Sequence, residues 1–179
     1  MKKIVLFFAI TLAAMQLNAQ FTRATLQATG LTCAMCSNAI NKALQAEPFI
    51  QSVRSDIKNS SFDIVFKENA DANIDAIRKA VEDAGFAIGS LKITGTFNEV
   101  KIGNDKHVKI GDKNFHFINV SDQVLNGEKT ITIVDKDFVT AKQFKKFSAS
   151  TKLKCIETGK AGACCEGVEA GTRMYHVTI

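Results

Sequence analysis

The hydrophobic residues of segment 21–93 fall into six stretches with a period of either two or three to four residues, and the order of these stretches is the strongest constraint on the fold. Apolar residues alternate with polar ones where a period of two indicates a half-buried strand. Elsewhere they recur every three to four residues, which places them on one face of a helix. The strand-type segments are 24–28, 53–57, 62–66 and 86–93, and the helix-type segments are 36–44 and 71–84.

Residues that typically cap or end helices and strands support these boundaries. Gly30 ends the first strand pattern, and Pro48 follows the first helix pattern as a stop signal. Asp71 is placed to cap the second helix, and Gly85 is placed to end it. The resulting order is strand, helix, strand, strand, helix, strand. This order predicts the split βαβ, ferredoxin-like arrangement for residues 21–94.

From Thr94 onward the helical rhythm fades, which predicts a second, mostly β domain at residues 96–179. Asn126-Gly127 is typical of a tight turn. One helix is expected at 137–147, and a loop rich in Gly, Ala and Cys at 159–171. An oligonucleotide/oligosaccharide-binding (OB) type barrel fits this pattern, and a split β-sandwich fits almost as well. The chain as a whole is predicted to be α+β. The expected strands of this half are 97–102, 107–110, 115–120, 129–135, 152–157 and 173–179.

The first residues predict export. Lys2 and Lys3 precede an apolar run at 4–14, and Ala19 supplies a small residue before Gln20. This layout is that of a cleaved secretory signal peptide at residues 1–19, too short to be a comfortable membrane span. We therefore expect a periplasmic or secreted protein, not embedded in the membrane after cleavage, whose thiols work in an oxidising compartment.

Composition argues against several functions. The net charge is only +5, there is no Trp and a single Tyr, and lysines are scattered among acidic residues, so a nucleic-acid surface is not expected. No Ser/His/Asp set or phosphate-binding Gly loop is present. Asp135 and Asp137 are assigned to turn formation and helix capping. Enzymatic activity is therefore not expected.

The stretch Gly30-Leu31-Thr32-Cys33-Ala34-Met35-Cys36 carries the clearest chemistry. Cys33 lies in the loop after the first strand, and Cys36 lies at the start of the first helix, where backbone N–H groups and the helix dipole favour a thiolate. Two thiolates on an exposed loop suit a soft ion such as Cu(I), Hg(II) or Zn(II). The spacing alone also permits a disulfide formed after export, or a thiol–disulfide redox pair.

This stretch resembles the G-M-T-C-x-x-C signature of the heavy-metal-associated domain family. That family includes copper chaperones, the N-terminal modules of copper-transporting ATPases and periplasmic mercury-binding proteins. The resemblance covers residues 21–94 and implies that Cys33 and Cys36 are the metal ligands. It also implies that Phe86, near the loop, tunes metal release. The usual Met is Leu31 here, which should keep that residue's packing role beneath the loop.

Three further cysteines lie near the C-terminus: Cys155, Cys164 and Cys165. A disulfide from Cys155 to one of the adjacent pair would close a short hairpin and add about 2–3 kcal/mol. Alternatively, the three thiols form a second soft-metal site, or they form an exit site that receives metal from Cys33 and Cys36.

The histidines leave a separate possibility open. His116, Met174 and His176 fall on predicted strands and together suggest a His/Met copper site. A strand histidine is, however, more often solvated or simply hydrogen-bonded. His107 has no apparent partner.

The sequence therefore predicts an exported protein that captures a soft ion, Cu(I) above all, and transfers or sequesters it. A mercury scavenger using the same site is the alternative ion assignment. A thiol–disulfide module is the alternative class. The β-rich half is a candidate docking module for a metal efflux component or a copper enzyme.

Overall fold

The computed structural model describes residues 20–31 and 33–179, so the predicted signal peptide lies outside the described part. No helix within this part is long and apolar enough to cross a membrane. The elements are β1 (Gln20–Thr29), α1 (Ala34–Gln45), β2 (Ile50–Asp56), β3 (Ser61–Phe66), α2 (Ile74–Asp83), β4 (Ala87–Ile102), β5 (Lys106–Ile110), β6 (Lys113–Phe117), β7 (Gln123–Ile133), α3 (Ala141–Ser148), α4 (Cys155–Thr158) and β8 (Met174–Thr178).

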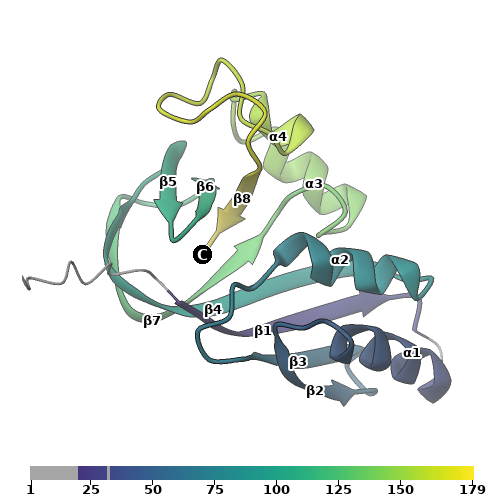
Figure 1. The fold of residues 1–179 in the computed structure, drawn as a ribbon. Coiled ribbons are helices and arrows are strands. Elements are labelled where there is room, and N and C mark those ends of the chain that lie inside the picture. Colours follow the sequence, from purple (N-terminus) through teal and green to yellow (C-terminus); the bar gives the residue numbers. More distant parts are fainter. Residues whose placement is uncertain (1–19, 32) are drawn as a thin grey trace, which may run out of the picture.

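The N-terminal half has the predicted ferredoxin-like arrangement. The strands follow the order β2-β3-β1-β4, and each pairs antiparallel with its neighbour. Helices α1 and α2 lie against each other over one face of this sheet (Figure 1). The predicted βαββαβ order, and with it the mixed α+β class, is confirmed.

Alternation along the strands builds the core between sheet and helices. Leu26, Ile64 and Ile93 point from neighbouring strands, and Ile40 and Ile77 from α1 and α2; all five are fully buried. Burying one such side chain is worth about 1.5–3 kcal/mol, so this face fixes the register of the sheet.

The C-terminal end of α2 confirms the predicted stop at Gly85, and its N-terminal end differs from the prediction. Gly85, with φ of +87°, follows the helix; its N–H bonds to Glu82 O and that of Phe86 bonds to Val81 O, the paired pattern of a Schellman stop. The predicted cap Asp71 was wrong. Asn73 caps α2 through its side chain, while Asp71 pairs with Lys113.

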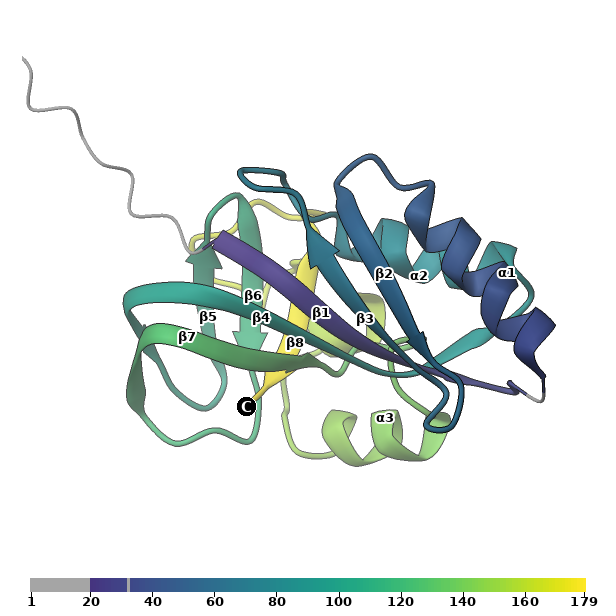
Figure 2. The same cartoon turned by 90° about the horizontal axis from the view of Figure 1, so that it is seen from below.

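The two halves share one sheet. Strand β4 runs without interruption through residues 94–96, pairing with β1 on one edge and β7 on the other. The full order is β2-β3-β1-β4-β7-β8-β6-β5, an open sheet with β2 and β5 at its edges (Figures 1 and 2). A separate OB-type barrel is therefore not confirmed, because the C-terminal strands extend the first sheet instead of closing on themselves.

Two local predictions in this half were wrong. Asn126-Gly127 does not turn a hairpin; it lies inside β7, where Gly127 faces Phe97 beside an irregularity in the β4–β7 ladder. Segment 152–157 is not a strand, because Cys155–Thr158 forms the short helix α4, ended by Gly159 at φ +66°. The helix predicted at 137–147 is present as α3, but it starts later, at a capping box made by Thr140 and Gln143.

Candidate metal centres

The two thiols of the N-terminal loop lie together at the exposed start of α1. Gly30, at φ +80°, turns the chain out of β1, and Cys33 is the N-cap of α1. The Cys33 sulfur accepts a hydrogen bond from the Cys36 backbone N–H at 3.4 Å and lies 2.7 Å from the Cys36 sulfur. Both cysteines are free thiols, and Cys33 is exposed. The pair is open to solvent, and its two sulfurs converge.

Local electrostatics favour the thiolate at Cys33. The hydrogen bond from the Cys36 thiol, followed by that from the Cys36 backbone N–H, holds the pKa of Cys33 below its usual range. A lowered pKa raises the thiolate fraction, which is the form that binds metals and attacks electrophiles. Met35, between the two cysteines, is 83% exposed, so it does not fill the core beneath the loop.

Leu31 has the packing role that the resemblance implied, whereas the tuning role implied for Phe86 stays a prediction. Leu31 packs against the main core. Phe86 is also partly buried against that core. Thr29 pairs with Ala87, so the Gly85–Phe86 loop leaves the sheet at the same end as the Cys33 loop. A hollow of about 110 Å³ is lined by Leu31, Cys33, Ser37 and Ile57.

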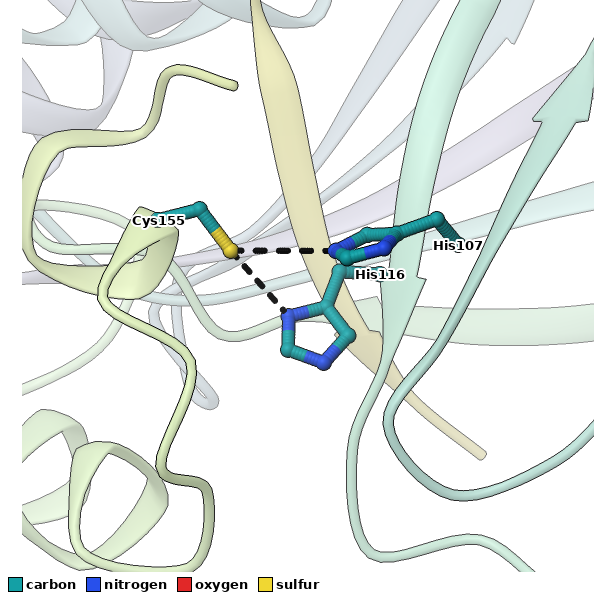
Figure 3. A group of neighbouring side chains, drawn as sticks. All are labelled: His107, His116 and Cys155. Carbon is teal, nitrogen blue, oxygen red and sulfur yellow. Dashed lines mark hydrogen bonds between the residues drawn. The ribbon is translucent and has the colours of Figure 1, made fainter. Parts of the chain in front are cut away.

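A second group of thiols and imidazoles is buried in the C-terminal half. His107 on β5 and His116 on β6 face each other across the hairpin, with ring centres 4.7 Å apart. Both point at the sulfur of Cys155 on α4 (Figure 3). The sulfur lies 3.8 Å from His107 Nε2 and 3.7 Å from His116 Nδ1. His116 and Cys155 are almost wholly buried, and His107 is half-buried.

His176 joins this group from β8. Its Nε2 lies 3.4 Å from the same sulfur, and its ring centre is 5.0 Å from that of His116, its register partner on the parallel strand. All three histidines of the chain therefore converge on Cys155. We call His107, His116, Cys155 and His176 the buried cluster.

On two of these rings, the nitrogen that does not face Cys155 is hydrogen-bonded to a carboxylate. Asp105 Oδ1 lies 3.1 Å from His116 Nε2, and Asp135 Oδ1 lies 2.5 Å from His176 Nδ1. Asp135 does begin the predicted turn, since Phe138 N donates to its carbonyl oxygen. Its side chain, however, is buried and bonds His176 and Arg173, a role that its place in the sequence did not indicate.

The remaining predicted residues lie around the buried cluster. Cys164 and Cys165 have their sulfurs 3.6 Å apart, and together with Cys155 they form a trio whose sulfurs all lie within 4.8 Å of one another. All five cysteines are free thiols in the described part, which therefore holds no disulfide at Cys155. Met174 is buried and packs with Cys155 and Cys165.

Burial favours the uncharged forms of His107, His116 and Cys155. Loss of hydration, followed by the charges of His176 and His107, lowers the pKa of His116 to about 4. Burial likewise lowers the pKa of His107 and raises that of Cys155. Neutral imidazoles are the form in which histidine binds a metal ion.

Fold and loop together define a class: a ferredoxin-like βαββαβ unit that presents two adjacent thiols at the start of its first helix. The comparison with known families agrees. Residues 25–87 match the family described as the heavy-metal-associated domain, which confirms the predicted resemblance.

Relatives match the same part of the chain. A probable copper-transporting ATPase, HMA5 from Arabidopsis thaliana, is 34% identical over 74 residues, which are 41% of this chain and 7% of that protein. A copper-transporting ATPase of Helicobacter pylori is 34% identical over 58 residues, 32% of this chain and 8% of that protein. The chain thus spans less than a tenth of the length of these relatives.

Solved structures also resemble part of the chain. A copper binding domain from HMA7, a P-type ATPase, is 32% identical with a TM-score of 0.33, covering 36% of this chain and 86% of that one. The CopZ metallochaperone is 19% identical with a TM-score of 0.35, covering 37% of this chain and 98% of that one.

Proposed function

We propose that this protein captures a soft metal ion, Cu(I) above all, at Cys33 and Cys36, and passes it on or sequesters it. The observation that carries the proposal is the convergence of two exposed sulfurs, 2.7 Å apart, at the N-terminal end of α1. Soft thiolates prefer Cu(I), Hg(II) and Zn(II) over hard cations. The relatives that match this segment are named copper-transporting ATPases, which favours copper among these ions.

Exposure suits a carrier better than a storage site. Neither sulfur is enclosed by further ligands of the described residues, so an incoming thiol of a partner can displace one ligand at a time. In this proposal the protein has no catalytic role, and its place of action is the periplasm or the medium, following the predicted signal peptide at residues 1–19. The recipient is a metal efflux component or a copper enzyme.

An anaerobic Cu(I) titration against a competing chelator tests the proposal. Reduced wild-type protein is compared with Cys33→Ser/Cys36→Ser, and we expect the variant to lose one equivalent of bound Cu(I). The matched control is Cys164→Ser, a single thiol removed from the opposite end of the chain, which should keep that equivalent. Equal Cu(I) binding by wild type and by the N-terminal double variant would refute the assignment.

A thiol–disulfide role is the second candidate, and the same proximity of the two sulfurs supports it. A redox titration of the wild-type protein, together with a disulfide-exchange assay, separates the two functions. A carrier should show no exchange activity, and bound Cu(I) should protect its two thiols from oxidation.

A further inference from the structure

We propose that the buried cluster is a second metal site, in which His107, His116, Cys155 and His176 bind one zinc or copper ion. The sulfur of Cys155 is the common point of the group. Nitrogens of the three imidazoles lie 3.8, 3.7 and 3.4 Å from it. The ligand atoms of His107, His116 and Cys155 also lie within 4.8 Å of one another.

These separations match the edges of a coordination tetrahedron. Bond lengths of about 2.3 Å to sulfur and about 2.0–2.1 Å to nitrogen place tetrahedral N and S ligands about 3.6 Å apart. The observed S···N distances of 3.4–3.8 Å therefore fit the three sulfur edges of one tetrahedral ligand shell. The ligand atoms that all lie within 4.8 Å of one another are those of His107, His116 and Cys155, so the ring of His176 must move toward the other two imidazoles to complete the shell.

Hydrogen bonding alone does not satisfy the group. A carboxylate only accepts, so Asp105 fixes the proton of His116 on Nε2, and Asp135 fixes that of His176 on Nδ1. The other nitrogen of each ring is then a lone pair, and both lone pairs face the Cys155 sulfur. A thiol carries one proton and can serve only one of them. A cation placed among these atoms would satisfy all of them at once.

The two carboxylates are themselves typical of a metal site. Histidines that bind metals almost always donate their second ring N–H to a carboxylate, a carbonyl or a water, which fixes the tautomer and the ring orientation. Two independent rings of the buried cluster show this arrangement, on different strands and with different partners. His116 and His176 are also completely buried, where an unpaired polar atom is costly.

The ligand types select the ion. Three imidazoles and one thiolate suit zinc and copper, whereas calcium and magnesium require oxygen ligands. Four protein ligands leave no open position, which is typical of a structural site holding its ion permanently. Such an ion would tie α4 to β5, β6 and β8, which already pair with one another in the sheet.

This site is separate from the carrier site of the proposed function. The N-terminal end of α1 and the β5, β6 and β8 group lie at opposite ends of the molecule in both views (Figures 1 and 2). Direct transfer of an ion from Cys33 and Cys36 to Cys155 within one molecule is therefore not part of the proposal. We also place Cys164 and Cys165 outside the four-ligand shell; with Cys155 they form the competing, all-sulfur set.

The test uses the full chain with Cys33→Ser and Cys36→Ser, so that only the second site remains. Reduced protein is incubated anaerobically with Zn(II) or Cu(I) in separate arms and desalted, and bound metal is counted by mass spectrometry. X-ray absorption then determines the ligand shell. We expect one retained equivalent of at least one of these ions, with a shell of three nitrogens and one sulfur.

Variants in this background identify the ligands. His107→Ala, at the half-buried position, should lose the ion or bind it far more weakly, and metal should no longer raise the Tm. Asp105→Asn should weaken binding about 10–100-fold while keeping the same ligand shell, as expected for a positioning residue. Cys164→Ser/Cys165→Ser is the control and should keep one equivalent with an unchanged shell.

Either of two results would overturn the proposal. One is that neither ion is retained by correctly folded protein, as judged by circular dichroism. The other is a shell of three sulfurs that survives His107→Ala and disappears in Cys164→Ser/Cys165→Ser. Zinc and copper share this ligand chemistry, so the arm in which the protein retains metal after desalting identifies the ion.

Discussion

The carboxylate of Asp75 on α2 accepts two hydrogen bonds from the guanidinium of Arg173, which precedes β8 and lies 98 residues further along the chain. Arg173 Nε and Nη2 donate at 2.9 and 3.1 Å. Tyr175 adds a hydroxyl donor to the same carboxylate at 3.0 Å, and Arg173 also bonds Asp135. This network joins the helical layer of the N-terminal half to the strand that carries His176.

Removing the charge of Asp75 should destabilise the whole protein. Asp75→Asn leaves the half-buried Arg173 with a weaker acceptor, and we expect a loss of about 1–2 kcal/mol in the free energy of unfolding. This loss is smaller than that for a fully buried ion pair because solvent screens the partly exposed charges. The matched control is Asp83→Asn, which breaks the exposed pair with Lys79 on the same helix and should cost less than about 0.5 kcal/mol. Urea unfolding of both variants, monitored by circular dichroism, measures the difference; equal effects would contradict the bridging role.

The same carboxylate predicts an acid-dependent part of stability. Burial alone would raise the pKa of Asp75, but the hydrogen bonds and charge of Arg173 outweigh burial and hold the pKa below the ordinary value of 3.8. The unfolded chain then binds this proton more readily, so the contribution of Asp75 is complete above the unfolded pKa and is lost as pH falls through the folded pKa. Unfolding measured from about pH 6 down to about pH 3 should show the gap between wild type and Asp75→Asn narrowing at the acid end. A gap independent of pH would argue against this assignment.

Substitution of Cys33 by serine should leave the fold intact. Cys33 caps α1 through its sulfur, and serine is a better N-cap, accepting the same backbone hydrogen bond. We expect Cys33→Ser to change stability by no more than about 0.5–1 kcal/mol, with the sign toward stabilisation. Thermal unfolding of the metal-free variant checks this. A large loss of stability would mean that the sulfur has a structural role, and metal-binding results for this variant would then reflect misfolding.

The five thiols should differ widely in reactivity. Cys33 is exposed and its pKa is lowered by its hydrogen bonds with Cys36, whereas Cys155 is buried with a raised pKa. Brief alkylation with iodoacetamide near neutral pH, followed by peptide mass spectrometry, should label Cys33 first and Cys155 last. Early labelling of Cys155 in folded protein would show that the buried cluster opens readily.

The N-terminal half could be predicted because its signals are local. Alternation at 24–28 specifies a strand, and helical spacing at Ile40 and Leu44 specifies a helix, each within a few residues. Gly85 ends α2 through hydrogen bonds with residues close to it in the sequence. The cap of α2 was missed because Asp71 and Asn73 are equally good cap types, and tertiary pairing of Asp71 with Lys113 decided between them. The continuation of β4 through residue 95 depends on its partner β7, which no local pattern reveals.

The two candidate sites also differ in how far the sequence could predict them. Cys33 and Cys36 are neighbours in sequence, so their spacing was enough to bring them together. The buried cluster combines residues from β5, β6, α4 and β8, and it was only partly anticipated. The register that sets His107 opposite His116 depends on the turn between β5 and β6, and Cys155 was assigned to a strand that is in fact α4. The one available signal was that all three histidines fall on predicted strands of the same half.

The most direct test of the central claim isolates the exposed thiols. In the variant Cys155→Ser/Cys164→Ser/Cys165→Ser, Cys33 and Cys36 are the only thiols that remain. Anaerobic Cu(I) titration of this reduced variant, with X-ray absorption at the endpoint, should show one equivalent bound through two sulfurs. A variant that binds no Cu(I), or binds it without sulfur ligands, would contradict the proposal that this loop captures a soft metal ion.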